Sequence, residues 1–94
     1  MIYEISNAKI SIAVNTCGAE LFSIKSPDGT EYLWQGTAPY WNSRASNIFP
    51  VCGRLFENKY TCEGQTYEMR CHGFARFTEF ELEAQTEDSL TFRK

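Results

Sequence analysis

The 94-residue sequence lacks the features that mark several common classes of function. It has a single histidine, His72, and its four cysteines form no Cys-x-x-Cys pair, so the ligand spacing of a zinc site is missing. Nine basic residues against twelve acidic ones give a net charge of −3. The chain therefore has no excess of positive charge with which to neutralise nucleic-acid phosphates or to approach anionic lipid. We expect neither nucleic acid nor membrane as a partner.

Long hydrophobic runs are also missing. No stretch approaches the 18 or more apolar residues of a membrane-spanning helix. The opening Met-Ile-Tyr-Glu-Ile has neither a basic segment nor a long apolar one, so a secretory signal is not expected. We therefore predict a cytoplasmic protein whose four cysteines, Cys17, Cys52, Cys62 and Cys71, are reduced and act as small buried thiols.

Helical periodicity is absent as well, and alternation takes its place. Apolar and polar residues alternate over residues 10–14, and residues 21–25 predict a second strand that ends at a Ser-Pro-Asp-Gly turn. Residues 32–34 predict a short third strand. Residues 60–62 and 66–68 flank a Glu-Gly-Gln turn, and residues 80–84 and 90–92 flank Thr-Glu-Asp-Ser, so two hairpins are expected. The pattern predicts one all-β domain over residues 1–94, with antiparallel strands.

Two irregular segments interrupt these strands. Residues 36–56 are rich in aromatic residues, asparagine, proline and glycine, and residues 71–76 read Cys-His-Gly-Phe-Ala-Arg. Long irregular segments in compact domains are often functional. The aromatic residues of the first segment favour order over disorder and are expected to pack in the core: Tyr40, Trp41, Phe49 and Phe56.

The irregular segments hold the polar side chains best suited to bind a ligand. Arg54 and Arg76 each offer a planar fork of donors, His72 can donate or accept a proton near neutral pH, and Asn47 adds an amide. Taken alone, these residues can also have ordinary structural roles. A lone histidine is often structural, Arg54 can pair with a glutamate across a turn, and Arg76 can be a surface residue of a strand.

Two motifs make the sequence resemble a known family. Asn-Ile-Phe-Pro-Val-Cys-Gly-Arg-Leu at residues 47–55, followed by His-Gly-Phe-Ala-Arg at residues 72–76, is similar to the aldose 1-epimerase, or galactose mutarotase, family. Further elements fit in the same order, among them Gly-Ala-Glu-Leu at residues 18–21 and Glu-Tyr-Leu-Trp-Gln-Gly at residues 31–36. The resemblance spans essentially the whole chain.

The resemblance implies a fold and a reaction. The fold would be the N-terminal part of a galactose mutarotase-like β-supersandwich, with a monosaccharide bound on one sheet face. The reaction would interconvert the α and β anomers of an aldose: a base takes the C1 hydroxyl proton, an acid protonates the ring oxygen, and the ring opens and recloses. Neither a metal nor an organic cofactor would be required.

The resemblance also assigns roles to three residues. Arg54 matches the substrate-gripping arginine of the family, and His72 matches its first histidine, which hydrogen-bonds the sugar and helps to stabilise charge on its oxygens. Asn47 resembles a residue that lines the cleft. Arg76 follows the same motif but receives no role, and Phe77 stands where an acidic or small polar residue is expected.

The second histidine and the glutamate that serve the family as acid and base have no counterpart here. We therefore expect a truncated member that is inactive alone and forms a homo-oligomer through unpaired sheet edges. A non-catalytic carbohydrate-binding or β-sheet interaction module is the alternative.

Overall fold

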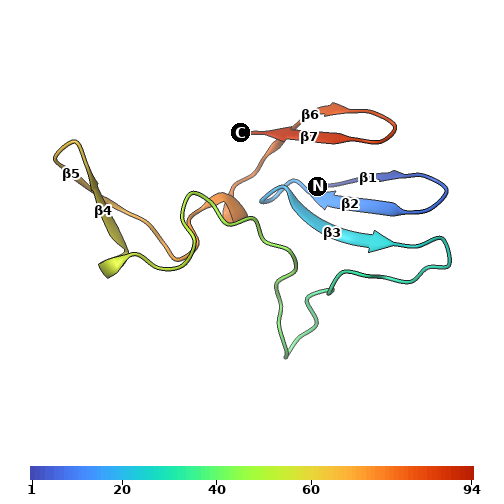
Figure 1. Ribbon diagram of the computed structural model, residues 1–94, viewed down its shortest axis with the longest axis horizontal. Helices are drawn as coiled ribbons and strands as arrows, with labels where there is room; N and C mark the ends of the chain where they lie inside the picture. The colour runs from blue at the N-terminus through green and yellow to red at the C-terminus, as the bar shows by residue number, and fades with distance from the viewer.

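Three strands that follow one another in the chain form the largest sheet. In the computed structural model, which describes residues 1–94, β1 (Ile2–Ser6), β2 (Ser11–Asn15) and β3 (Glu20–Lys25) lie side by side in the order β1-β2-β3, with antiparallel pairing throughout (Figure 1). The central residue of β2, Ala13, is buried, and its neighbours are half-buried. The structure therefore confirms the strands that the sequence predicted at β2 and β3.

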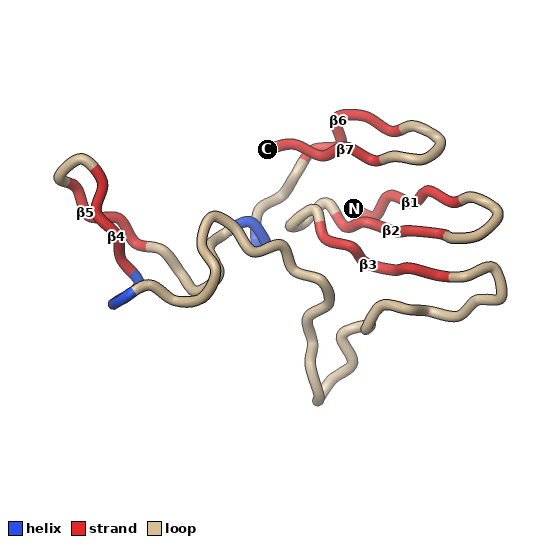
Figure 2. The backbone as a smooth tube through the Cα atoms, in the orientation of Figure 1, coloured by secondary structure: helices blue, strands red, loops and turns tan.

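Two hairpins follow this sheet. β4 (Lys59–Cys62) pairs with β5 (Gln65–Glu68), and β6 (Glu81–Gln85) pairs with β7 (Leu90–Arg93), both antiparallel (Figure 2). The only helical segments are single 3-10 turns, η1 (Phe56–Asn58) and η2 (Ala75–Phe77), and none is long or apolar enough to cross a bilayer. The prediction of an all-β, antiparallel chain with almost no helix is confirmed.

One predicted strand is wrong. Residues 32–34 form no strand, and only two isolated bridges, Lys25 with Glu31 and Leu21 with Ala45, extend the sheet on that side. The Glu31 carboxylate accepts hydrogen bonds from the Ser23 hydroxyl and from the N–H groups of Ile24 and Leu33. A side chain thus occupies two of the backbone donors that a continuous ladder would use. Pairing of this stretch with β3 is limited to the Lys25 bridge and to the hydrogen bond from the Tyr32 N–H to the Ile24 carbonyl at 2.8 Å.

The β6–β7 hairpin packs beside the first sheet through a few side chains and loops. The Thr16 side chain, only 3% exposed, accepts from the Met1 ammonium at 3.0 Å and donates to the Glu79 carboxylate just before β6. The rings of Tyr3 on β1 and Phe92 on β7 lie 6.1 Å apart. Two backbone hydrogen bonds, from Gly18 to the Thr78 carbonyl and from Phe80 to the Thr16 carbonyl, flank an isolated bridge between Cys17 and Glu79. Together these contacts hold the hairpin against the first sheet.

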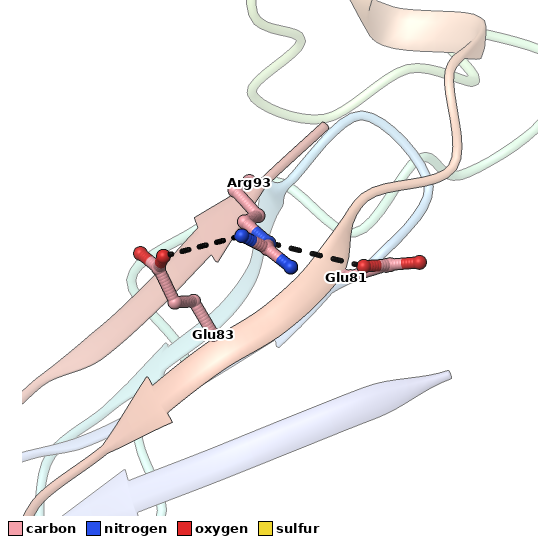
Figure 3. Close-up of polar contacts among 3 residues, drawn as sticks. All are labelled: Glu81, Glu83 and Arg93. Atoms are coloured by element: carbon pink, nitrogen blue, oxygen red, sulfur yellow. Dashed lines mark ion pairs between the residues drawn. The ribbon is translucent and has the colours of Figure 1, made fainter.

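Charged residues cover the outer surface of this hairpin. Arg93 on β7 lies between Glu81 and Glu83 on β6, with nitrogen–oxygen distances of 3.9 and 3.8 Å (Figure 3). All three side chains are at least half exposed, so each ion pair is worth well under about 1 kcal/mol. The glutamates of this strand form a solvated face, as its alternation predicted.

The β4–β5 hairpin stands apart from the rest of the chain. Figure 1 shows it extended at one end of the molecule, and every residue of both strands is exposed. The radius of gyration is 16.4 Å, whereas a compact domain of this length would have about 12 Å. The molecule is therefore elongated, and much of its surface has no partner within the chain.

Few side chains are buried. Only 6 of the 94 residues are, and the apolar ones are Ala13, Met69 and Ala75. The prediction of an aromatic core was wrong, because the exposed fractions are 79% for Tyr40, 65% for Trp41, 60% for Phe49 and 87% for Phe56. These rings have no second layer to pack against, since the irregular segment runs outside the sheet.

The expectation of buried thiols fails for the same reason. Three cysteines, Cys17, Cys52 and Cys62, are exposed, and Cys71 is half-buried. All four are free thiols. No group of three or more histidine, cysteine or acidic side chains is gathered as a metal site would require.

Candidate functional site

The two irregular segments come together at the base of the β4–β5 hairpin. Phe49 and Gly73 form an isolated parallel bridge, and the Phe49 carbonyl accepts from the N–H groups of Phe74, at 2.9 Å, and Ala75, at 3.2 Å. The rings of Phe49 and Phe74 meet edge to face at 6.4 Å. We call residues 49–54 and 71–75 the neck, since they connect the hairpin to the rest of the molecule.

Close backbone contact at the neck requires a glycine. At Gly73, which has a φ of +75°, an added Cβ would overlap the Phe49 carbonyl oxygen and lie 2.7 Å from the Pro50 nitrogen. Real Cβ atoms do not tolerate either contact. The Gly in the His-Gly-Phe motif therefore serves to let the two segments cross, and this crossing places His72 beside the Gly-Arg of the other segment.

His72 is held by two hydrogen bonds to one residue. Its N–H donates to the Gly53 carbonyl at 2.8 Å, and the Gly53 N–H donates to the Nδ1 atom of the imidazole at 2.9 Å. Nδ1 must therefore be unprotonated, and in the neutral ring the hydrogen sits on Nε2. The half-buried ring is fixed in orientation and leaves an Nε2–H donor for a ligand.

The backbone of His72 is strained. Its φ of +63° lies in the left-handed region, which non-glycine residues seldom adopt. Conformations of this kind persist only where surrounding contacts hold them, and they gather at functional sites. Here the paired hydrogen bonds to Gly53 supply that support.

Arg54 follows Gly53 directly and so lies next to the His72 contact. Its side chain is exposed and makes no hydrogen bond or ion pair within the chain. The alternative that it pairs with a glutamate is not realised. Its planar fork of donors is available to a ligand.

Asn47 has a different environment from the other two. Its Nδ2 group donates to the carbonyls of Gly18 and Ala19, each at 2.8 Å. Both amide hydrogens are therefore used to attach the irregular segment to the loop after β2. None of the principal cavities is lined by Arg54, His72 or Asn47, so a ligand at the neck would meet an open face.

Comparison with known proteins gives this arrangement a context. The model of the aldose 1-epimerase family matches residues 1–94. The chain belongs to the aldose 1-epimerase family. Among curated relatives of Lactococcus lactis subsp. lactis, the plasmid and chromosomal forms of protein LacX are each 41% identical over 98% of this chain and 32% of their own length.

Solved structures agree with that assignment. A galactose mutarotase related enzyme from Lactobacillus acidophilus superimposes with a TM-score of 0.93 and 41% identity, over 98% of this chain and 31% of that one. A galactose mutarotase-like protein from Lactobacillus casei gives 0.91 and 33%, over 98% and 32%. The fold is therefore that of the N-terminal portion of a galactose mutarotase-like protein, and the chain spans about a third of the length of its relatives.

The family motifs account for most of the neck, but not for all of it. They point to Arg54 and His72, whereas the Gly53 N–H that orients the imidazole is a backbone donor without a side-chain signature. A second arginine, Arg44, lies in the irregular segment and lines a cavity with Arg76. Sequence reasoning passed over Arg44 because it stands in no periodic pattern and outside both motifs.

Proposed function

We propose that the neck binds an aldose, and that Arg54 and His72 are this chain's contribution to the interconversion of its anomers. The observation that carries the proposal is the hydrogen bond from Gly53 N–H to Nδ1 of His72. It fixes the orientation and the tautomer of the one imidazole of the chain through Gly53, the residue that precedes Arg54. Family membership supplies the substrate class and the reaction.

The two side chains would share the work of holding the sugar. Arg54 presents five donors in one plane and can span two neighbouring hydroxyl oxygens. The Nε2–H of His72 would donate a hydrogen bond to a further sugar oxygen. This hydrogen bond would strengthen as that oxygen gains negative charge. Both groups are donors, so they bind and stabilise charge but do not remove the C1 proton.

A complete reaction needs a base on the C1 hydroxyl and an acid on the ring oxygen. His72 has its Nδ1 occupied by Gly53, and no carboxylate contacts it. We therefore propose that these 94 residues bind sugar weakly and do not catalyse by themselves. Neither metal nor organic cofactor enters this scheme. A cytoplasmic location stays a prediction from the sequence.

Two isosteric variants separate the two ends of the imidazole. In His72→Asn the amide oxygen takes the place of Nδ1, so the Gly53 contact is kept while the distal donor is lost. In His72→Gln the distal amide donor is kept and the near acceptor is lost. Titration with galactose and glucose, followed by NMR, should show binding lost in His72→Asn and in Arg54→Ala, and partly retained in His72→Gln.

The sugar titration can contradict the proposal directly. Binding that is equal in the parent chain, His72→Asn and Arg54→Ala would place the sugar elsewhere. No binding of any aldose by a folded chain would instead favour a non-catalytic module that acts through its β-sheets. Polarimetry of freshly dissolved α-galactose tests the proposal that the 94 residues do not catalyse by themselves. We expect no rate above that of buffer, and a saturable rate that His72→Ala abolishes would refute this proposal.

We further propose that the chain self-associates. Its accessible surface is 7062 Å², whereas a compact folded monomer of 10.8 kDa exposes about 5,500 Å². The excess of about 1,500 Å² exceeds the roughly 800 Å² that each partner buries in a standard interface. Exposed aromatic rings and the unpaired edges of the β4–β5 and β6–β7 hairpins offer the surface. Sedimentation equilibrium should report a dimer or larger species, and a monomer at millimolar concentration would refute this.

A further inference from the structure

A polar cavity lies where the first irregular segment (residues 36–56) meets the start of β3 and the η2 turn. It has a volume of about 280 Å³ and is lined by seven residues, only one of which is hydrophobic. Two of the seven are arginines, Arg44 and Arg76, which come from the two different irregular segments of the chain. None of these residues belongs to the proposed sugar contacts at Arg54 and His72.

Both arginines line this cavity, and each has one unsatisfied donor. The Nε atoms of Arg44 and Arg76 are buried and have no hydrogen-bond partner, and they are the only buried side-chain polar atoms of the chain in that state. Leaving a buried charged donor without a partner is costly, so such groups are normally satisfied by a protein atom or a ligand. That both occur at one cavity is the observation that carries the inference.

Each guanidinium is held in place by its other contacts. Arg44 stacks 3.8 Å above the Phe22 ring and donates through Nη2 to the Gln35 side chain at 3.4 Å. Arg76 lies 4.7 Å from the Phe77 ring and donates through Nη2 to the Cys71 carbonyl at 3.3 Å. Stacking and a single anchoring hydrogen bond fix each plane and leave Nε without a partner.

The local charge favours an anion. Neither arginine forms a salt bridge, since the only ion pairs of the chain involve Arg93. One carboxylate, that of Glu20, also lines the cavity, but it accepts from the Ala45 N–H at 2.9 Å and from the Ser46 hydroxyl at 3.5 Å. Two positive charges therefore stand against one negative charge that is already engaged by donors.

The remaining lining residues add neutral hydrogen-bonding groups. Ser43 and Asn42, which carry a hydroxyl and an amide, line the same cavity. An oxyanion can accept several hydrogen bonds at once, and guanidinium groups offer the matching planar donors. The geometry points to a binding site for a small oxyanion, a phosphate or a carboxylate group, gripped between Arg44 and Arg76. This site goes beyond the proposed sugar contacts and does not depend on them.

A lysine substitution tests whether the guanidinium groups are needed. Arg44→Lys and Arg76→Lys keep the charge but remove the planar fork and its Nε–H. Arg93→Lys is the matched control, because it changes the same atoms at an exposed site between Glu81 and Glu83 (Figure 3). Amide spectra of each variant establish that the fold is kept before any titration.

Inorganic phosphate and acetate serve as probes at constant ionic strength. We expect saturable shifts for residues around Arg44 and Arg76, and at least about tenfold weaker binding in each of the two lysine variants, the loss expected for one charge-assisted hydrogen bond. Arg93→Lys should bind as the parent does. Tighter binding of phosphate indicates a phosphorylated ligand, and tighter binding of acetate indicates a carboxylate.

Three results would overturn the assignment. These are the absence of a saturable response to either anion, equal binding by the parent and both lysine variants, and an equal loss in Arg93→Lys. The last result would show that only general surface charge attracts the anion. Because no sugar is used, failure of this test leaves the sugar proposal standing, and failure of the sugar titration leaves this one standing.

Discussion

The three-stranded sheet and the β4–β5 hairpin are built from similar strands but are supported in different ways. Strands β1 to β3 share two ladders, a buried Ala13 and the Thr16 contacts to Met1 and Glu79. The hairpin has one ladder and no buried residue in either strand. Isolated two-stranded hairpins are marginal in water. Arg54 and His72 flank the less supported element, so the proposed sugar contacts would depend on the neck.

The largest expected effect comes from breaking the neck itself. Gly73→Ala introduces a Cβ that overlaps the Phe49 carbonyl at a φ of +75° and should lower the free energy of unfolding of this region by at least about 3 kcal/mol. Gly64→Ala, with φ +80° at the open hairpin tip, should cost only about 1–2 kcal/mol. Urea unfolding measures both, and equal losses would contradict the special role of the neck.

A smaller effect should follow from loosening the supported half. Thr16→Val keeps the shape of the side chain but loses the bonds to the Met1 ammonium and to Glu79, which should cost about 1–2 kcal/mol. Amide exchange should rise around β2 and residues 78–80 and stay unchanged in the hairpin. Thr86→Val, whose hydroxyl contacts are all exposed, is the control. Exchange that rises first in the hairpin would reverse the comparison.

The hairpin can be weakened alone. Tyr60 and Tyr67 stack across β4 and β5 with centroids 5.3 Å apart, and such cross-strand aromatic pairs contribute about 1 kcal/mol. Tyr67→Ala should increase amide exchange in residues 59–68 and leave β1 to β3 unaffected. Tyr32→Ala removes a more exposed ring outside any pair and should change neither region. Spread of the effect into the first sheet would show that the two regions are coupled.

Acid should act mainly on the supported half, and only locally. Hydrogen bonds from Ser23 and from the Ile24 N–H lower the pKa of Glu31 below its usual 4.5, and those from Ser26 and Thr30 lower the pKa of Asp28 to about 2. A carboxyl whose pKa is lower in the folded state than in the unfolded state stabilises the fold at any pH above its unfolded-state pKa. That stabilisation is lost as the pH falls through its folded-state pKa. As pH falls below 4.5 and through the lowered pKa of Glu31, exchange at Ile24 and Leu33 should therefore rise. Glu31→Gln should abolish that rise.

The fold was largely accessible from the sequence because alternation is a local signal. It located β2 to β7, but it missed β1, where the apolar Ile2 on the exposed face blurs the contrast with the half-buried Tyr3 and Ile5. Burial was not accessible in the same way. Whether Tyr40 or Phe56 lies in a core depends on a second layer, and composition does not reveal whether that layer is present.

The candidate site was accessible only in part. The two motifs named Arg54 and His72, and the structure adds that Gly53 lies between them as backbone donor and acceptor. Asn47 was expected at the sugar, but the same amide makes two contacts to Gly18 and Ala19, which the motif does not encode. Arg44 had no pattern to mark it, because its importance lies in a cavity shared with a residue 32 positions later in the chain.

The projection of the β4–β5 hairpin has a practical consequence. Its Glu63-Gly64 tip is exposed and lies at the far end from the neck, and exposed tips of this kind tolerate insertions. A fluorophore or a short tag grafted there would report on events at the base of the hairpin without touching them. A probe at the tip of the β4–β5 hairpin would thus allow changes near Arg54 and His72 to be followed.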